Sequence, residues 1–320
     1  MIKLEQKVRG IYVKINLFQS IYKNLLEFLT NQDPYFKYES GRSEDIAKAI
    51  GLNANDSTIQ SNIFQRDLNR LLDKYYFYQK RHIPVQKWTV KTAANMSCPN
   101  VLEDYYNNFK ENAEKGEDLN PYLSKKTERI DECDQLLSHW GIYHFHLGEL
   151  KEGEKFVSRS GPVLFAKIFE NTIFFINVLQ HGAWNRFELI ETVCREFPES
   201  MKQYILNGVM NPKPVIKSEE DIKKLRACNI NTIIEVDGVC YSKFGVMSDG
   251  TDGECKIKAD WACKKLKNLE DNLIKSEGKI KKCLNTNNEI VIETKYDKKE
   301  QNKIKIFVKA NGYTIWKIEF

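Results

Sequence analysis

Residues 160–182 read SGPVLFAKIFENTIFFINVLQHG, and this stretch decides the fold of the middle of the chain. It holds two runs rich in β-branched and aromatic residues, 163–169 and 172–180, separated by Glu170-Asn171. Two such runs around a short polar turn predict a β-hairpin. A third run of the same kind precedes them at 142–147, so the three runs predict a small antiparallel sheet.

The run at 142–147 also carries two of the five histidines of the chain. Because successive strand side chains point to opposite faces, His144 and His146 are expected on one face and Phe145 on the other. His181 ends the second strand of the hairpin, and Arg159 precedes its first strand. We therefore expect the three histidines and Arg159 to face one cleft.

Helical patterns flank this central part. Apolar residues three and four positions apart predict helices over 3–30, Glu44–Ile50, 58–78, 101–114, 184–196 and 259–276. The turn pairs Asp237-Gly238 and Asn311-Gly312 predict two further hairpins, the second within the strands 289–296, 303–310 and 313–320. The chain is thus expected to have an α+β fold. Its expected parts are a helical N-terminal domain at 1–118, a central antiparallel β-sheet domain with flanking helices at 119–212, and a basic α/β C-terminal lobe at 213–320.

Composition restricts the class of protein. The chain of 320 residues has a net charge of +5, and residues 264–320 alone carry 14 lysines against 8 acidic residues. Such a basic lobe is typical of a surface that approaches phosphate backbones. The eight cysteines show no CxxC pair, so neither a zinc knuckle nor a redox pair is predicted. The absence of a long apolar run and of a signal peptide predicts a cytoplasmic protein that does not contact a membrane.

Three interpretations of the histidine segment remain open. In the first, His144, His146 or His181 acts as general acid or base and Arg159 stabilises phosphate charge, which suffices to cleave RNA without metal or cofactor. In the second, His144, His146, Glu149 and His181 bind a metal in a cupin-like enzyme. In the third, the histidines are structural and the chain is a non-catalytic module that binds protein or nucleic acid.

The run from Asn120 to about Asp260 resembles a family of poorly characterised bacterial proteins. The resemblance is carried by the segments NPYLSKK, DQLLSHWGIYHFHLGE, SRSGPVLFAKI, INVLQHGAWNRFELIETVCREFPES, DIKKLRACNI and VDGVCYSKFGVMSDG. It covers under half of the chain and implies no defined activity.

The order of a histidine-bearing strand, an arginine, a hairpin and a terminal histidine is also similar to that of RelE/HigB-type toxin ribonucleases. That resemblance implies Arg159 and His181 as the catalytic pair, with His144 and His146 beside them. It further implies an endoribonuclease of toxin or phage-defence type. The side chains expected to bind RNA are Trp140, Trp184 and Arg186, and an antitoxin or other partner protein is expected to bind through the N-terminal helices.

Overall fold

A computed structural model of the chain describes residues 14–15, 17–38, 57–209, 216, 218–285, 291–296, 305–310 and 313–319. The expected helix at Glu44–Ile50 lies outside these residues, as does the beginning of the one expected over 3–30. The chain divides into two compact units. Unit 1 comprises Met1–Gln79, Glu128–Asp131 and Cys255–Phe320, and unit 2 comprises Lys80–Thr127 and Glu132–Glu254.

Unit 2 is built on the sheet that the central hairpin predicts. Strands β3 (Ile142–His146), β4 (Pro162–Phe169) and β5 (Thr172–Gln180) are antiparallel neighbours, and β2 (Thr89–Thr92) joins β5 in parallel. The turn between β4 and β5 passes through Glu170, whose φ of 50° is left-handed. The prediction of three antiparallel strands is confirmed. The four-residue strand β2 is too short to give a period-2 signal of its own.

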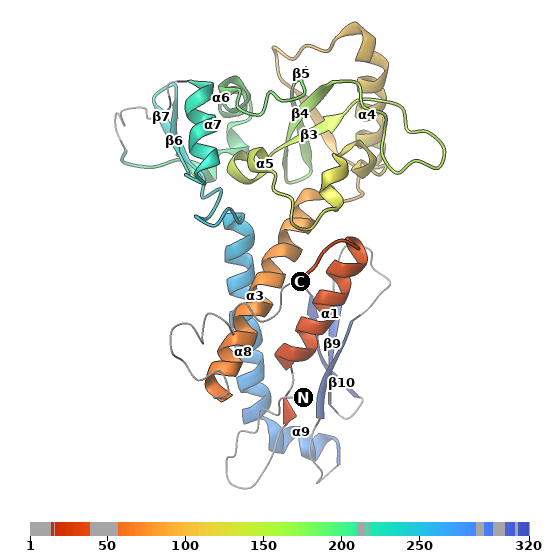
Figure 1. The fold of residues 1–320 in the computed structure, drawn as a ribbon, viewed down its shortest axis with the longest axis vertical. Coiled ribbons are helices and arrows are strands. Elements are labelled where there is room, and N and C mark those ends of the chain that lie inside the picture. The colour runs from red at the N-terminus through yellow and green to blue at the C-terminus, as the bar shows by residue number, and fades with distance from the viewer. Residues whose placement is uncertain are drawn as a thin grey trace. The chain divides into compact units, whose positions relative to one another are not determined.

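Helices cover both faces of this sheet (Figure 1). On one face, Phe145 and Phe175 pack against Phe109 of α4 (Glu103–Lys115). On the other face, Phe165 and Phe174 share a core with α6 (Phe187–Glu196). Because both faces of the sheet are apolar, alternate residues of each strand are buried in two separate cores, one on each face.

Shorter elements complete unit 2. Helices α5 (Gln135–Trp140) and α7 (Glu219–Ala227) have no counterpart in the sequence prediction, whereas the hairpin of β6 (Ile233–Val236) and β7 (Val239–Ser242) confirms it. Asp237 and Gly238 both have positive φ, 51° and 77°, as a type I′ turn requires.

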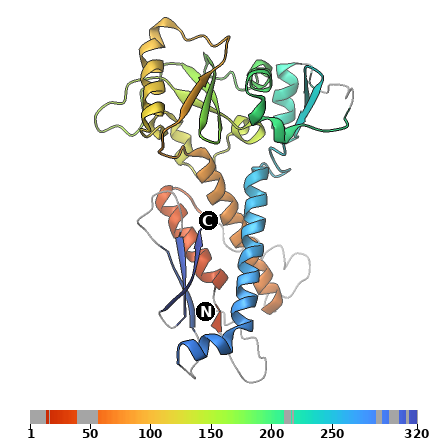
Figure 2. The same cartoon turned by 180° about the vertical axis from the view of Figure 1, so that it is seen from behind.

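Unit 1 packs three helices against a second sheet (Figure 2). The helices are α1 (Leu17–Gln32), α3 (Ser57–Arg81) up to Gln79, and α8 (Gly253–Lys275) from Cys255, followed by the short α9 (Glu277–Cys283). The sheet has the order β1 (Lys14–Ile15), β8 (Val291–Tyr296), β9 (Lys305–Ala310) and β10 (Tyr313–Glu319).

The chain therefore has a mixed α+β fold. Its two units differ from the three consecutive domains expected from sequence, because the first helices and the last strands share one core. Leu25 of α1, Leu71 of α3, Leu266 of α8 and Val308 of β9 are all buried in it. The apolar stripe of α1 is thus buried in the core of unit 1. Every helix in the described ranges is too short or too polar to cross a lipid bilayer.

Among the described residues of the helix expected over 3–30, two form a strand and the helix follows them. Lys14 and Ile15 form β1, which pairs in parallel with β8, and α1 starts at Leu17. Pairing with a strand almost 280 positions away overrides the local helical pattern, and no sequence window of helical length contains that information.

Candidate functional site

A pocket of about 540 Å³ opens in unit 2 where the end of β5 and the loop before β4 meet α5 and α7. Its polar character is set by cationic, acidic and imidazole side chains drawn from seven segments of the chain. The residues lining it are Arg81, Ser124, Lys126, Thr127, Glu132, Cys133, Asp134, Gln135, Leu136, His144, Arg159, His181, Trp184, Asn185, Lys223 and Arg226.

His144 faces a carboxylate. Asp134 is the N-cap of α5, and its Oδ1 accepts a hydrogen bond of 3.0 Å from the backbone N–H of Leu137. Its Oδ2 lies 3.6 Å from Nδ1 of His144, which leaves Nε2 as the nitrogen turned away from the carboxylate. Burial lowers the pKa of His144, and the charge of Asp134 opposes that shift. His144 is therefore a neutral imidazole at pH 7, with an acidic neighbour that favours its uptake of a proton.

His146 lies behind the pocket and does not line it. Its side chain is 3% exposed, and among the described residues neither ring nitrogen has a hydrogen-bond partner. Its ring stacks on that of His181, with centroids 5.8 Å apart and planes at 27°. Burial lowers the pKa of His146 to about 4. The structure thus places His146 as a support for His181, whereas the sequence placed it in the cleft.

The indole ring of Trp184 contacts both histidines of the pocket. Its ring centroid lies 4.6 Å from that of His144 and 4.8 Å from that of His181, and it also contacts Phe165. Because two imidazole rings pack against the indole, less of its surface is free to stack on a base. We therefore assign Trp184 the task of separating and orienting the two rings.

Arg159 is exposed at the rim of the pocket, on a loop that is hydrogen-bonded to the residues just after β3. Ser158 exchanges two hydrogen bonds with the backbone of Glu149, at 2.8 and 3.0 Å. The hydroxyl of Ser160 donates to the carbonyl oxygen of Leu147 at 2.7 Å. Within the described part of the chain Arg159 forms no ion pair, so its guanidinium is free to meet an anion.

Four further cations line the pocket and were missed by sequence reasoning: Arg81, Lys126, Lys223 and Arg226. Arg226 is buried and donates to the carbonyl oxygen of Trp184 and, at 3.0 Å, to Oδ1 of Asn185. Burial lowers its pKa to about 10, so it stays charged at neutral pH. The segment DIKKLRA gives no sign that its arginine turns inward, because tertiary packing decides this.

Other expected site residues lie elsewhere. Trp140 is 4% exposed in the core around α6, so its indole cannot stack on a base. Arg186 does not line the pocket and pairs with Glu188 at 3.1 Å and Glu219 at 3.4 Å. Glu149 is exposed outside the pocket. In the described ranges no three His, Cys, Asp or Glu side chains are arranged to hold a metal ion, so the cupin-like ligand set does not assemble.

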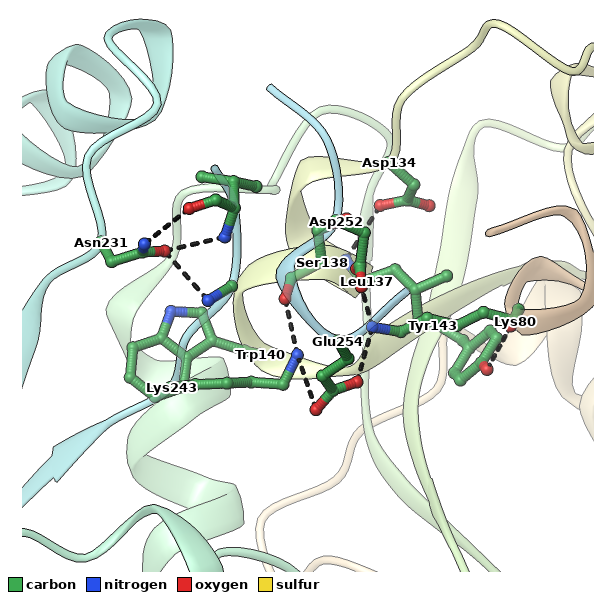
Figure 3. A network of polar contacts seen from close by, with 12 residues as sticks. Lys80, Asp134, Leu137, Ser138, Trp140, Tyr143, Asn231, Lys243, Asp252 and Glu254 are labelled. Atoms are coloured by element: carbon green, nitrogen blue, oxygen red, sulfur yellow. Dashed lines mark hydrogen bonds and ion pairs between the residues drawn. The ribbon is translucent and has the colours of Figure 1, made fainter. Parts of the chain in front are cut away.

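A buried polar network fixes α5, the helix that carries Asp134 (Figure 3). Lys243 donates to the carbonyl oxygen of Ser138 at 2.6 Å, and Lys167 donates to that of Trp140 at 2.7 Å. These are carbonyl groups of the last turn of the helix, which lack partners within it. Burial lowers the pKa of Lys243 to about 8 and that of Lys167 to about 7.

Two carboxylates balance these lysines. Glu254 lies 3.3 Å from Lys243 and 2.8 Å from Lys80, and Asp252 lies 2.7 Å from Lys80. Burial alone raises the pKa of Glu254, but the charges of Lys80 and Lys243 outweigh it and hold the value at about 2. Figure 3 shows this carboxylate between the two ammonium groups. The network therefore anchors α5 to the end of α3 and to the 243–254 segment.

The lowered pKa of His146 predicts acid sensitivity. The unfolded chain takes up the proton near pH 6.5 and the folded chain only near pH 4, so the free energy of unfolding falls as the pH drops through that window. The slope is at most about 1.4 kcal/mol per pH unit for each such histidine. His139, whose pKa burial also lowers to about 4, adds a similar contribution. Because burial also lowers the pKa of His144, His146→Phe should remove part of this slope and not all of it in urea unfolding between pH 7.5 and 5. An unchanged slope would contradict the assigned burial.

No family model, curated protein or solved structure matches this chain. The function is therefore argued from the pocket itself.

Proposed function

We propose that the chain is an endoribonuclease that uses the 2′-hydroxyl of its RNA substrate as nucleophile and needs no metal ion. The observation that carries the proposal is the pocket itself: His144, His181 and Arg159 line one cavity of about 540 Å³ together with other cations. That volume is within the range of pockets that enclose a nucleotide-sized ligand. The cations favour a substrate that carries negative charge.

The chemistry follows from the ribose. The 2′-oxygen attacks the adjacent phosphorus, the bond to the 5′-oxygen breaks, and the products are a 2′,3′-cyclic phosphate and a 5′-hydroxyl. A base must remove the 2′-proton and an acid must protonate the leaving 5′-oxygen. Charge that develops on the phosphoryl oxygens needs a cation nearby. Two histidines and an arginine supply this set.

We assign the roles of base and acid to different histidines. His144 is neutral at pH 7 and has Asp134 3.6 Å from Nδ1, so it is suited to accept the 2′-proton at Nε2, and the carboxylate stabilises the imidazolium that forms. His181 is exposed and follows the end of β5 directly, so we assign it as the acid that protonates the leaving 5′-oxygen. Trp184 lies between them, which keeps the two rings apart as an in-line displacement requires.

Arg159→Ala tests the charge-stabilising role. We expect this variant to lower the rate of RNA cleavage by about 10²-fold, in the lower range for loss of one charge-stabilising group. Arg195→Ala is the matched control, because Arg195 is an equally exposed arginine of unit 2 that pairs with Asp237 at 2.9 Å and does not line the pocket. The assay is cleavage of a labelled RNA in EDTA.

Each alternative has its own outcome in that assay. Activity that is lost in EDTA and restored by a divalent ion would favour a metal-dependent enzyme. RNA binding without cleavage would favour a binding module. Equal rates for Arg159→Ala and Arg195→Ala would remove Arg159 from the mechanism.

A toxin or phage-defence role belongs to the same proposal. Expression of the chain in a bacterium should slow growth, since cleavage of cellular RNA stops translation. His181→Ala should restore growth at equal protein level. Full growth inhibition by the variant would mean that the chain acts by binding.

A further inference from the structure

Unit 1 carries a groove of about 700 Å³ between α3 and α8, called here the α3–α8 groove. The two helices cross each other in the ribbon (Figures 1 and 2). The side-chain amide of Asn69 donates a hydrogen bond of 2.7 Å to Oδ1 of Asp260. The charged side chains that line it are Arg66, Arg70, Lys256, Asp260, Lys264 and Lys267. Five cations and one carboxylate therefore share one concave surface.

The acidic residues nearby neutralise only part of this charge. Lys256 lies 3.8 Å from Asp260, and Lys267 is paired with Glu270 at 3.0 Å. Arg66, Arg70 and Lys264 form no ion pair with any described residue. An ordinary solvated helix face pairs its charges within one helix. Here cations from two helices converge, which concentrates the positive potential.

An exposed aromatic ring lies beside one of the lysines that line the groove. Trp261 of α8 is 59% exposed, and Nζ of Lys264 lies 5.4 Å from the centre of its ring. Ile257, one turn earlier, is 46% exposed. A tryptophan in water beside a row of cations is the arrangement that binds unpaired bases, because the ring stacks on a base while the cations hold the backbone.

We propose that the α3–α8 groove binds the phosphate backbone of single-stranded RNA and that Trp261 stacks on one of its bases. The choice of RNA over other polyanions rests on the proposed function. This surface is distinct from the pocket in unit 2. Among the described lysines of the basic segment 264–320, Lys264 and Lys267 alone line the groove.

Deletion of residues 264–320 is not a usable test. Leu266, Leu273 and Val308 belong to the core of unit 1, so their removal would unfold it. Point substitutions at exposed positions avoid this problem. Binding should be measured in the full chain with His181→Ala present in every arm, so that the RNA stays intact.

The groove variant is Arg66→Gln with Lys264→Gln. Its matched control is Lys23→Gln with Lys258→Gln, which removes the same charge from exposed positions of α1 and α8 that do not line the groove. For a labelled single-stranded RNA, the slope of log K against log salt should shrink by about 1.4 in the groove variant, or ~0.7 for each lost contact. The slope of the control should match that of the parent.

Trp261→Ala tests the stacking. It should weaken binding of the single strand by about 5- to 150-fold and leave binding of an RNA duplex unchanged, since paired bases cannot stack on the ring. Equal salt slopes for the groove and control variants, or tighter binding of the duplex than of the single strand, would overturn the inference. Because cleavage plays no part in this assay, either failure would leave the proposed ribonuclease standing, and loss of cleavage alone would leave the groove standing.

Discussion

Replacement of His181 by alanine is expected to lower the rate of RNA cleavage by about 10²–10⁴-fold, and replacement of His144 by a similar factor. Each variant removes one of the two proton-transfer groups of the pocket. His181 is exposed at a strand end, so His181→Ala should change stability by no more than about 0.5 kcal/mol. Single-turnover cleavage under saturating enzyme measures the chemical step, and urea unfolding confirms the fold.

The double variant distinguishes catalysis from general damage. Groups that act together in one transition state lose activity non-additively, so His144→Ala with His181→Ala should be little slower than the slower single variant. Asp134→Asn should act through His144, because loss of the carboxylate should lower the pKa of that histidine further. The limb of the pH–rate profile on which the rate rises with pH reports the general base, and this limb should shift to lower pH. Full activity in the double variant would remove both histidines from the mechanism.

Asp252→Ala is expected to lower the free energy of unfolding by about 3–5 kcal/mol, the usual loss when one partner of a buried ion pair is removed. The side chain of Asp252 is fully enclosed, and that of its partner Lys80 is 13% exposed. In this variant Glu254 still faces Lys80 and Lys243. Urea denaturation at pH 7 measures the difference.

The surface pair Arg195–Asp237 provides the control for that experiment. Arg195 is 48% exposed and Asp237 is 64% exposed, so Arg195→Ala should change the free energy of unfolding far less than Asp252→Ala does. Equal destabilisation by the two substitutions would mean that the buried network does not anchor α5.

Local sequence was sufficient for the three antiparallel strands of the sheet in unit 2 and for the histidines on them. The hairpin of β4 and β5 is signalled by two β-rich runs and a two-residue turn, all within 20 positions, and the alternation in IYHFH places His144 and His146 on one face. Arg159 and His181 meet because the chain reaches them just before β4 and just after β5, and the backbone N–H of His181 donates to the carbonyl oxygen of Gly161 at 3.1 Å.

Long-range packing determined what the sequence did not reveal. Asp134 and Arg226 reach the pocket from different helices, and the lysines that hold α5 come from β4 and from the segment after β7. Trp140 and Trp184 flank the same sheet, but the first is buried in the core and the second lines the pocket. Periodicity gives the face of a side chain and not its depth, which is why base stacking was expected of both.

The division into units is also a non-local property. The helical pattern of α1 and the strand pattern of β9 each leave one apolar face that neither segment can bury alone, and their joint core places both ends of the chain in unit 1. A boundary drawn from composition along the chain cannot represent a unit made of three separate segments.

The most direct test of the central claim compares three oligonucleotides of the same base sequence in EDTA: RNA, its 2′-O-methyl derivative and DNA. The account predicts cleavage of the RNA alone, with products that end in a 2′,3′-cyclic phosphate and a 5′-hydroxyl, because the 2′-hydroxyl is the nucleophile. Cleavage of the 2′-O-methyl strand or of the DNA, or RNA products that carry a 3′-hydroxyl and a 5′-phosphate, would contradict it.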